Sequence, residues 1–143
     1  MMSTDTIAYI AGLFDGEGCV TCKKVKTKRK NRPKKFYNQW YVRCEISMTD
    51  KHIIQWIHET LGFGWSKEKK YHKRPAHYKR QWRWCCGYRD ALLFAKIIWP
   101  YVQVKIHDIE KIIDHYDDVK PDRKNVIDLN LYKQTKLERC PHN

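Results

Sequence analysis

Two acidic side chains near the start of the chain are the residues best placed to do chemistry. Asp15 and Glu17 flank Gly16 at the end of the nine-residue segment Ile10–Gly18, which reads IAGLFDGEG. Its apolar and small residues favour a helix, and Gly16 and Gly18 favour the end of that helix. The negative end of a helix dipole disfavours acids, so we expect a positive group nearby, and a bound metal ion is one candidate. Taken alone, the two carboxylates could also act as a pair in general acid–base chemistry.

The charge balance predicts a polyanionic partner. The chain has 143 residues, with 29 Lys and Arg against 16 Asp and Glu, for a net charge of +13. Such an excess favours nucleic acid through counterion release, and a merely basic protein of ribosomal type is the alternative. With 42% apolar and 13% aromatic residues the sequence does not resemble a disordered chain.

The sequence also predicts the compartment. No apolar run approaches the roughly 20 residues that cross a bilayer, and residues 1–7 lack the features of a signal peptide. We therefore expect no membrane partner, an intracellular, cytoplasmic protein and reduced cysteines. Cys19 and Cys22 have the spacing of a zinc half-site, and Cys85 and Cys86 are adjacent. Residues three apart on a strand point to opposite faces, which favours free thiols over zinc.

Hydrophobic periodicity and capping residues predict an α+β protein with an α-β-β-α-β-β-α-α order. Thr4 or Asp5 is the expected cap of the first helix, Asp50 of the second and Asp90 of the third. The predicted elements are a helix to about residue 16, a strand over 19–28, a cationic turn over 28–35, a strand ending at Met48, a helix from Asp50 closed by Gly62, a hairpin of strands 65–71 and 78–86, a helix from Asp90 interrupted by Pro100, and a helix through Ile109 and Tyr116. We expect one domain over residues 1–120 and a polar tail over 121–143, whose structure is left open.

The second strand has the clearest alternation in the chain. Trp40, Val42, Cys44, Ile46 and Met48 share one face, and polar residues share the other. This pattern is typical of an antiparallel sheet covered on one side. The uncovered face should collect basic, amide and aromatic groups able to read base edges, with simple solvation as the alternative; its expected members are Lys23, Gln39, Tyr41, Arg43, Lys67, Lys69, Gln81 and Arg83.

The segment Ile10–Gly18 and the element order αββαββα together resemble the LAGLIDADG homing endonucleases. Relative to that motif the segment has Ile for the first Leu, Phe for Ile, Gly for the second Ala and Glu for the second Asp. The resemblance implies an antiparallel sheet that forms a DNA-binding saddle backed by helices. One motif per chain implies a homodimer with the motif helix on its two-fold axis, acting on a long, near-palindromic double-stranded DNA site.

The resemblance also implies roles for single residues. Small residues at Ala8, Gly12 and Gly16 would allow the two motif helices to approach closely, with Asp15 organising the helix end or the subunit contact. Glu17 stands at the eighth motif position, that of the family's metal-binding carboxylate, and the Gly16 backbone carbonyl would be a second ligand. These hard oxygens suit Mg²⁺, with Mn²⁺ able to substitute.

A basic residue completes the implied site. The segment Trp99–Lys105 resembles the family's Pro-containing stretch before a lysine, so Lys105 is the second catalytic candidate, with a plain surface lysine as the alternative. The family often has a polar residue where Met48 stands here, and Ser47 and Thr49 are the candidates to take its place. Arg43 and Lys51 are further candidates for phosphate contacts.

Three functions follow from this resemblance. The first is a Mg²⁺-dependent, site-specific DNA endonuclease from an intron-encoded or free-standing mobile element. The second is a non-cleaving DNA-binding regulator on the same fold. The third is an RNA intron maturase, because a basic surface does not separate DNA from structured RNA.

Overall fold

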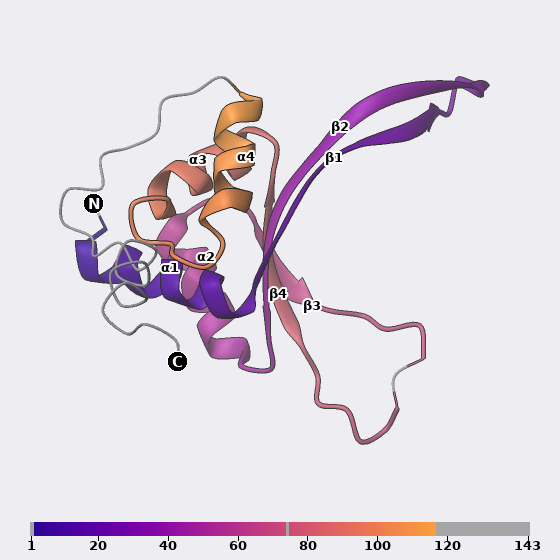
Figure 1. The fold of residues 1–143 in the computed structure, drawn as a ribbon. Coiled ribbons are helices and arrows are strands. Elements are labelled where there is room, and N and C mark those ends of the chain that lie inside the picture. Colours follow the sequence, from indigo (N-terminus) through magenta and orange to yellow (C-terminus); the bar gives the residue numbers. More distant parts are fainter. Residues whose placement is uncertain (1, 74, 117–143) are drawn as a thin grey trace, which may run out of the picture.

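The computed structural model describes residues 2–73 and 75–116, so the predicted tail over 121–143 lies outside the described residues. The elements follow the predicted order (Figure 1); they are α1 (Thr4–Glu17), β1 (Gly18–Arg29), β2 (Arg32–Met48), α2 (Lys51–Leu61), β3 (Trp65–Glu68), β4 (Trp82–Gly87), α3 (Arg89–Ile98) and α4 (Ile106–His115). The strands form a four-stranded antiparallel sheet in the order β1-β2-β4-β3. The helices lie together on one side of it (Figure 1), which confirms the predicted α+β fold.

The covered face of the sheet builds the core. Val42, Cys44 and Ile46 of β2 are buried, as the alternation predicted. Beside them the Trp84 ring of β4 lies 4.8 Å from the Phe94 ring of α3, which in turn lies 5.3 Å from Phe14 of α1. Aromatic rings at these separations add to the stability from apolar burial. The first helix is thereby fixed against the sheet through its inward face.

The helix ends confirm some capping predictions and correct others. Asp50 caps α2 by accepting a hydrogen bond from Ile53 N at 3.1 Å, and Gly62 ends that helix in the left-handed conformation, both as predicted. The cap of α1 is Ser3 rather than Thr4 or Asp5, because Ser3 Oγ accepts from Thr6 N. The prediction that Asp90 caps α3 was also wrong.

The residue that precedes α3 is Tyr88, and its backbone is unusual. Its φ is +54°, a region that non-glycine residues rarely occupy, and its side chain makes no capping hydrogen bond. Asp90 instead lies in the first turn of α3. Tyr88 N donates to Val42 O at 3.0 Å, so the sheet pairing continues up to the residue where the chain turns into the helix. Strain of this kind costs about 1–3 kcal/mol and persists where the surrounding structure fixes it.

The first hairpin is longer than predicted. Pairing of β1 with β2 continues to Arg29 and resumes at Arg32, so the turn is Lys30–Asn31 and the predicted turn over 28–35 was too wide. Thr27 pairs with Tyr37 near the tip, and residues of this kind favour strands. The hairpin projects well beyond the helices (Figure 1).

The second hairpin is shorter than predicted. β3 ends at Glu68 and β4 begins at Trp82, although Lys69 N still donates to Gln81 O at 2.7 Å. The predicted strands 65–71 and 78–86 were therefore too long at the turn end. The intervening sequence is dense in Lys, Arg and His, includes Pro75 and has no β-branched residue to support pairing.

Candidate functional site

The last turn of α1 presents an acid that has no partner within the described part of the chain. Glu17 is the final helical residue, is exposed, and makes no hydrogen bond or ion pair with another described residue. The last turn of α1 has no basic residue of its own. Gly16 beside it is also exposed, and its carbonyl belongs to the helix end, where intrahelical partners run out.

Asp15, two residues earlier, is fully engaged. Its carboxylate accepts hydrogen bonds from three successive backbone N–H groups, those of Gln103 at 2.8 Å, Val104 at 3.1 Å and Lys105 at 3.0 Å. These residues precede α4, which has no side-chain cap of its own. A carboxylate at a helix N-terminus is stabilised by both the N–H groups and the dipole. Asp15 therefore joins the end of α1 to the start of α4 within one chain.

Lys105 makes a second contact with Asp15, in which its side chain is the donor. Its Nζ donates to the backbone carbonyl of Asp15 at 2.6 Å. This ammonium is a positive group at the C-terminal end of α1, where the sequence predicted one. The structure thus brings Lys105 to the helix turn that includes Glu17, although they are 88 residues apart in the sequence.

The small residues of α1 form an open stripe. Ala8, Gly12 and Gly16 are exposed, and a Cβ built on Gly12 or Gly16 would meet nothing within 4 Å. Glycine in a helix costs roughly 0.5–1 kcal/mol relative to alanine, and no contact with a residue that the structure describes requires it at these two positions. Gly18 differs, because a Cβ there would collide with the ring and the carbonyl of Phe14.

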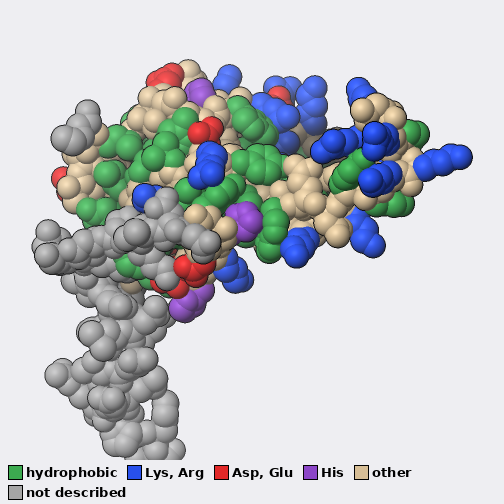
Figure 2. Space-filling view, turned by 90° about the horizontal axis from the view of Figure 1, so that it is seen from above, with side chains coloured by type: hydrophobic (Ala, Val, Ile, Leu, Met, Phe, Trp, Pro, Cys, Tyr) green, Lys and Arg blue, Asp and Glu red, His purple; other side chains and the backbone are tan. Residues whose placement is uncertain are grey.

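The uncovered face of the sheet collects the predicted basic and polar residues. The register places Lys23 opposite Tyr41, Val25 opposite Gln39, and Ser47 opposite Arg83, which lies opposite Lys67. Lys69 and Gln81 follow at the ends of the short strands. Because side chains alternate between faces, these residues point away from the helices. Lys and Arg side chains also gather along the projecting hairpin (Figure 2).

An acid that sequence reasoning did not include lies at the centre of this face. Glu45 accepts hydrogen bonds from Arg43 Nη2 at 2.7 Å and from Ser47 Oγ at 2.8 Å, and Arg83 Nη1 lies 3.7 Å away. Arg43 also donates to Tyr41 Oη at 3.0 Å and to Cys85 Sγ at 2.8 Å. The polar alternation of β2 could have identified Glu45, but not its partners on β4.

The charges of this cluster stabilise one another. Partial burial opposes ionisation of Glu45, but hydrogen bonds from Ser47 and Cys85 and the charges of Arg43 and Arg83 outweigh it and hold the Glu45 pKa below its usual value. Burial raises the pKa of the Cys85 thiol to about 11, against the opposing effect of the Arg43 hydrogen bond. Cys85 is therefore a neutral hydrogen-bonding group near pH 7.

A half-exposed tryptophan completes the cluster. The Trp65 ring has Lys67 Nζ at 4.6 Å and the guanidinium groups of Arg43 and Arg83 at 5.2 and 5.4 Å from its centre. Contacts of this type hold cations over an aromatic face. The Nε atoms of both arginines are buried without a hydrogen-bond partner in the described structure. Arg43 and Arg83 are thus held in place by their surroundings.

The other predicted positions take part in ordinary packing or hydrogen bonding. Met48 packs against the core, and Ser47 is engaged with Glu45. Cys19 is exposed on the uncovered face of β1, whereas Cys22 lies half-buried on the other face.

No group of three or more His, Cys, Asp and Glu residues able to hold a metal ion occurs among the described residues. Nor does any described helix combine the length and apolar character that crossing a membrane requires.

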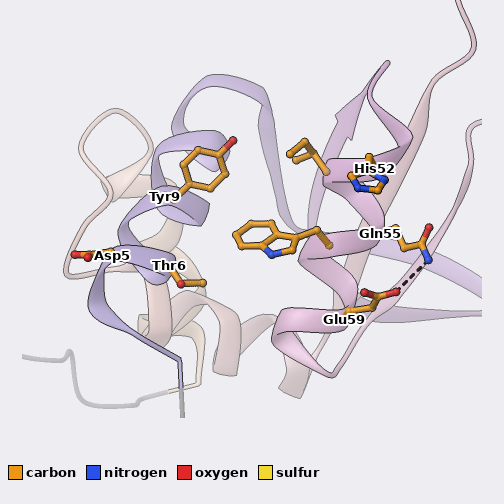
Figure 3. A pocket seen from close by; sticks show the side chains of 8 residues that line it. Asp5, Thr6, Tyr9, His52, Gln55 and Glu59 are labelled. Atoms are coloured by element: carbon orange, nitrogen blue, oxygen red, sulfur yellow. Dashed lines mark hydrogen bonds between the residues drawn. The ribbon is translucent and has the colours of Figure 1, made fainter.

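A groove of about 590 Å³ lies between α1 and α2 (Figure 3). Tyr9 and Trp56 meet edge to face in it, with ring centres 5.6 Å apart. Asp5 and Glu59 lie at its rim, and Gln55 donates to Glu59 at 3.0 Å. The groove borders the first half of α1, so it is separate from Glu17 at the other end.

Solved structures with a similar fold include homing endonucleases. The first is I-CvuI with its target in the presence of 2 mM Ca, with 19% identity and a TM-score of 0.57, covering 73% of this chain and 61% of that one. A second structure shows I-CvuI with the I-CreI target in 2 mM Mg, where the DNA is not cleaved, with 20% identity, a TM-score of 0.60 and coverage of 84% and 68%. The archaeal intron-encoded I-Vdi141I with DNA gives 15% identity, a TM-score of 0.52 and coverage of 95% and 98%.

These identities establish likeness of fold. The chain spans about three fifths of the I-CvuI chain in the first of those structures. No curated protein sequence matches the chain. The family model described as LAGLIDADG endonuclease matches residues 10–83, which is just over half of the chain and includes the segment that ends at Glu17. The protein therefore belongs to the LAGLIDADG endonuclease family.

Proposed function

We propose that the protein is a site-specific endonuclease for double-stranded DNA and that it works as a homodimer. The observation that carries the proposal is the end of α1, where Glu17 is exposed and has no partner among the described residues, while Lys105 is fixed to the same turn. An acid at the negative end of a helix is unfavourable in the isolated chain. It becomes favourable when a cation and a phosphate are bound beside it. The proposal assigns this activity to the domain predicted over residues 1–120, in an intracellular protein.

The donor set fits a hard divalent cation only in part. The Glu17 carboxylate and the Gly16 carbonyl are oxygen ligands of the kind that Mg²⁺ prefers, and Mn²⁺ accepts the same set. The described residues of one chain offer too few such groups to hold the cation alone, so phosphate oxygens, water and the second subunit's carboxylate would complete its ligands. When bound, the cation would supply Lewis acidity toward the phosphate.

The residues of the chain have separate tasks in this proposal. Glu17 holds the cation, and the Lys105 ammonium offers positive charge to a phosphate close to the end of α1. Asp15 fixes the backbone that carries Lys105 through its three hydrogen bonds. Asp15 is therefore a positioning residue, and the two acids do not act as an acid–base pair.

The open stripe of α1 supports the homodimer. Gly12 and Gly16 leave space that no residue of ranges 2–73 and 75–116 fills. A second copy of α1 would fill it, because the absence of side chains allows two helix backbones to approach closely. A two-fold axis there would bring together two Glu17 carboxylates, and it requires a target with near-palindromic halves.

The sheet face supplies the proposed DNA surface. Lys23, Gln39 and Tyr41 offer charge, amide and hydroxyl groups on the projecting hairpin, with Lys67, Lys69 and Gln81 on the shorter one. Arg43 and Arg83 are pre-oriented by Glu45, so Glu45 fixes the direction in which they meet the duplex. Such preorganisation lowers the entropy lost on binding.

The deciding experiment is cleavage of a duplex DNA library with randomised and locus-derived sequences, separately in Mg²⁺, Mn²⁺ and Ca²⁺. We expect discrete double-strand cuts in Mg²⁺ or Mn²⁺ that Glu17→Gln abolishes while DNA binding is retained. Asp5→Asn, at the opposite end of the same helix, is the matched control and should cleave like the parent protein. Specific binding without cleavage in any of these metals would instead indicate the DNA-binding regulator. A protein that binds DNA only as a monomer would contradict the shared site.

A further inference from the structure

The projecting hairpin has a second exposed face, which the proposed duplex surface does not use. Near the body this face is the core, where Val42 and Cys44 are buried under the helices. Further out the same face emerges from under α4, at the contact between the rings of Trp40 and His115, 4.6 Å apart. From there to the tip the face is open on the side of the ribbon that the helices cover at its base (Figure 1).

A regular ladder occupies this face. The register places Lys24 opposite Trp40, Lys26 opposite Asn38, and Lys28 opposite Phe36, all of them exposed. Lys24 Nζ lies 5.6 Å from the Trp40 ring centre, and Lys28 Nζ lies 4.7 Å from that of Phe36. One strand therefore carries the cations and the other carries the rings and an amide. We call these six residues the lysine–aromatic ladder.

The exposure of the rings is unfavourable unless something covers them. Phe36 is 59% exposed and Trp40 is 40% exposed, and each ring lies on the open face of a two-stranded ribbon. No acid lies anywhere between Glu17 and Glu45, so the hairpin itself carries only positive charge. This combination disfavours a basic protein partner because like charges repel, and it favours a polyanion that also has flat apolar surfaces.

The two faces of the hairpin differ in chemistry. The proposed duplex face presents Gln39, Tyr41 and Arg43, which suit the edges of base pairs in a groove. The ladder presents ring faces, and bases inside a duplex are already stacked and have no free face to offer. Side chains on opposite faces of a ribbon point in opposite directions. A duplex on one face therefore does not reach Phe36 or Trp40 on the other.

We propose that the lysine–aromatic ladder is a second nucleic-acid site, and that it binds unpaired, single-stranded DNA or RNA. The lysines contact successive phosphates, the rings of Phe36 and Trp40 stack on bases, and the Asn38 amide bonds to the base between them. This division of tasks is how single strands are held without strict sequence preference. The site goes beyond the proposed nuclease activity and does not depend on Glu17.

The test measures binding of fluorescein-labelled 12-nucleotide single strands of mixed sequence, DNA and RNA separately, by anisotropy with the full chain. Phe36→Ala should weaken single-strand binding roughly 5- to 150-fold, the effect of losing one base stack. Tyr37→Ala is the matched control, because Tyr37 is the next aromatic along β2 and lies on the opposite face. It should leave single-strand affinity within about twofold of the parent protein's. Circular dichroism melting confirms that both variants are folded.

A second variant tests the cations independently of the rings. Lys26→Ser should reduce the slope of log affinity against log salt by about 0.7 for the single strand, the value for one phosphate contact. Neither Phe36→Ala nor Lys26→Ser should change the affinity for a blunt duplex of the same sequence. Equal losses on single strand and duplex, or no loss on either, would overturn the proposal, as would a parent protein that binds no single strand. Glu17→Gln should bind single strands normally, so a failure of the nuclease proposal is recognised separately.

Discussion

The two sides of α1 differ in whether contacts within a single chain satisfy their side chains. The inward side packs Ile10 and Phe14 into the core, and Asp15 at its end accepts three hydrogen bonds from the segment before α4. The outward side has an open glycine stripe and the carboxylate of Glu17, which has no partner in the part of the chain that the structure describes. The difference teaches that two acids only two residues apart in one motif can have different roles, one in holding the fold together and one in binding. Stability should depend on the inward side, and activity on the outward side.

Substitution of Asp15 should produce the largest loss of stability. Asp15→Ala leaves the N-terminus of α4 without its acceptor, and hydrogen bonds to charged groups contribute about 1.5–3 kcal/mol each, although water replaces part of that at this half-exposed position. We expect a loss of about 2–4 kcal/mol in urea unfolding. Glu17→Gln, the matched variant, should stay within about 0.5 kcal/mol of the parent protein. Equal losses for both variants would refute the division between the two sides.

Substitution of Gly18 should come next. The Cβ of Gly18→Ala collides with the Phe14 ring and carbonyl, so the turn from α1 into β1 has to shift. Overpacking of this kind costs about 1–3 kcal/mol. Gly16 lies two residues earlier, in open space, so Gly16→Ala should not lower the free energy of unfolding in dilute protein. Chemical unfolding at a concentration too low for self-association compares the two, and a loss in Gly16→Ala as large as in Gly18→Ala would contradict the geometry.

Glu45 extends the comparison to the sheet. Like Asp15, it is an acid whose hydrogen bonds and ion pairs come from its own chain. Its pKa is lowered on folding, so it stabilises the protein at pH 7, and that stability is lost as the pH falls below the ordinary glutamate value of about 4.3 toward the folded pKa. Glu45→Gln should cost about 1–2 kcal/mol at pH 7, as for a partly buried charged hydrogen bond. The difference from the parent protein should shrink in unfolding measured near pH 3. A difference that is independent of pH would mean that the carboxylate charge contributes nothing.

The smallest effect has the opposite sign. Gly12→Ala should raise the unfolding free energy of the dilute chain by about 0.5–1 kcal/mol, because alanine is the better helix former and the space is empty. The same methyl group should weaken self-association, which analytical ultracentrifugation measures. Unchanged self-association would show that the stripe is not where two copies meet.

The sequence predicted most of the framework that the structure shows. The alternation of β2 identified the buried and the open faces, and Asp50 and Gly62 marked the ends of α2, because these signals are local. The hairpin lengths were wrong because pairing depends on the neighbouring strand. Lysine density alone predicted a wide first turn, yet Val25 and Thr27 keep β1 paired almost to its tip.

At the site, local sequence patterns did not predict which residues contact one another. The motif marked Asp15 and Glu17, but the partners of Asp15 are 88 to 90 residues away, so no spacing rule connects them. Glu45 lies on the polar face that the alternation of β2 identified, but it was not among the predicted site residues. Its role depends on Arg83 and Cys85, which a register between β2 and β4 brings opposite. The strained Tyr88 between β4 and α3 had no sequence signal at all.

The length of the first hairpin sets a scale for the target. An antiparallel strand rises about 3.4 Å per residue, and a DNA duplex rises the same distance per base pair. In the proposed complex, the 12 residues of β1 would therefore span about 12 base pairs of the groove. Alternate residues face the duplex, so each strand of the ribbon meets every second base pair. Two copies about a two-fold axis would span about 24 base pairs, long enough to occur by chance only rarely in a genome.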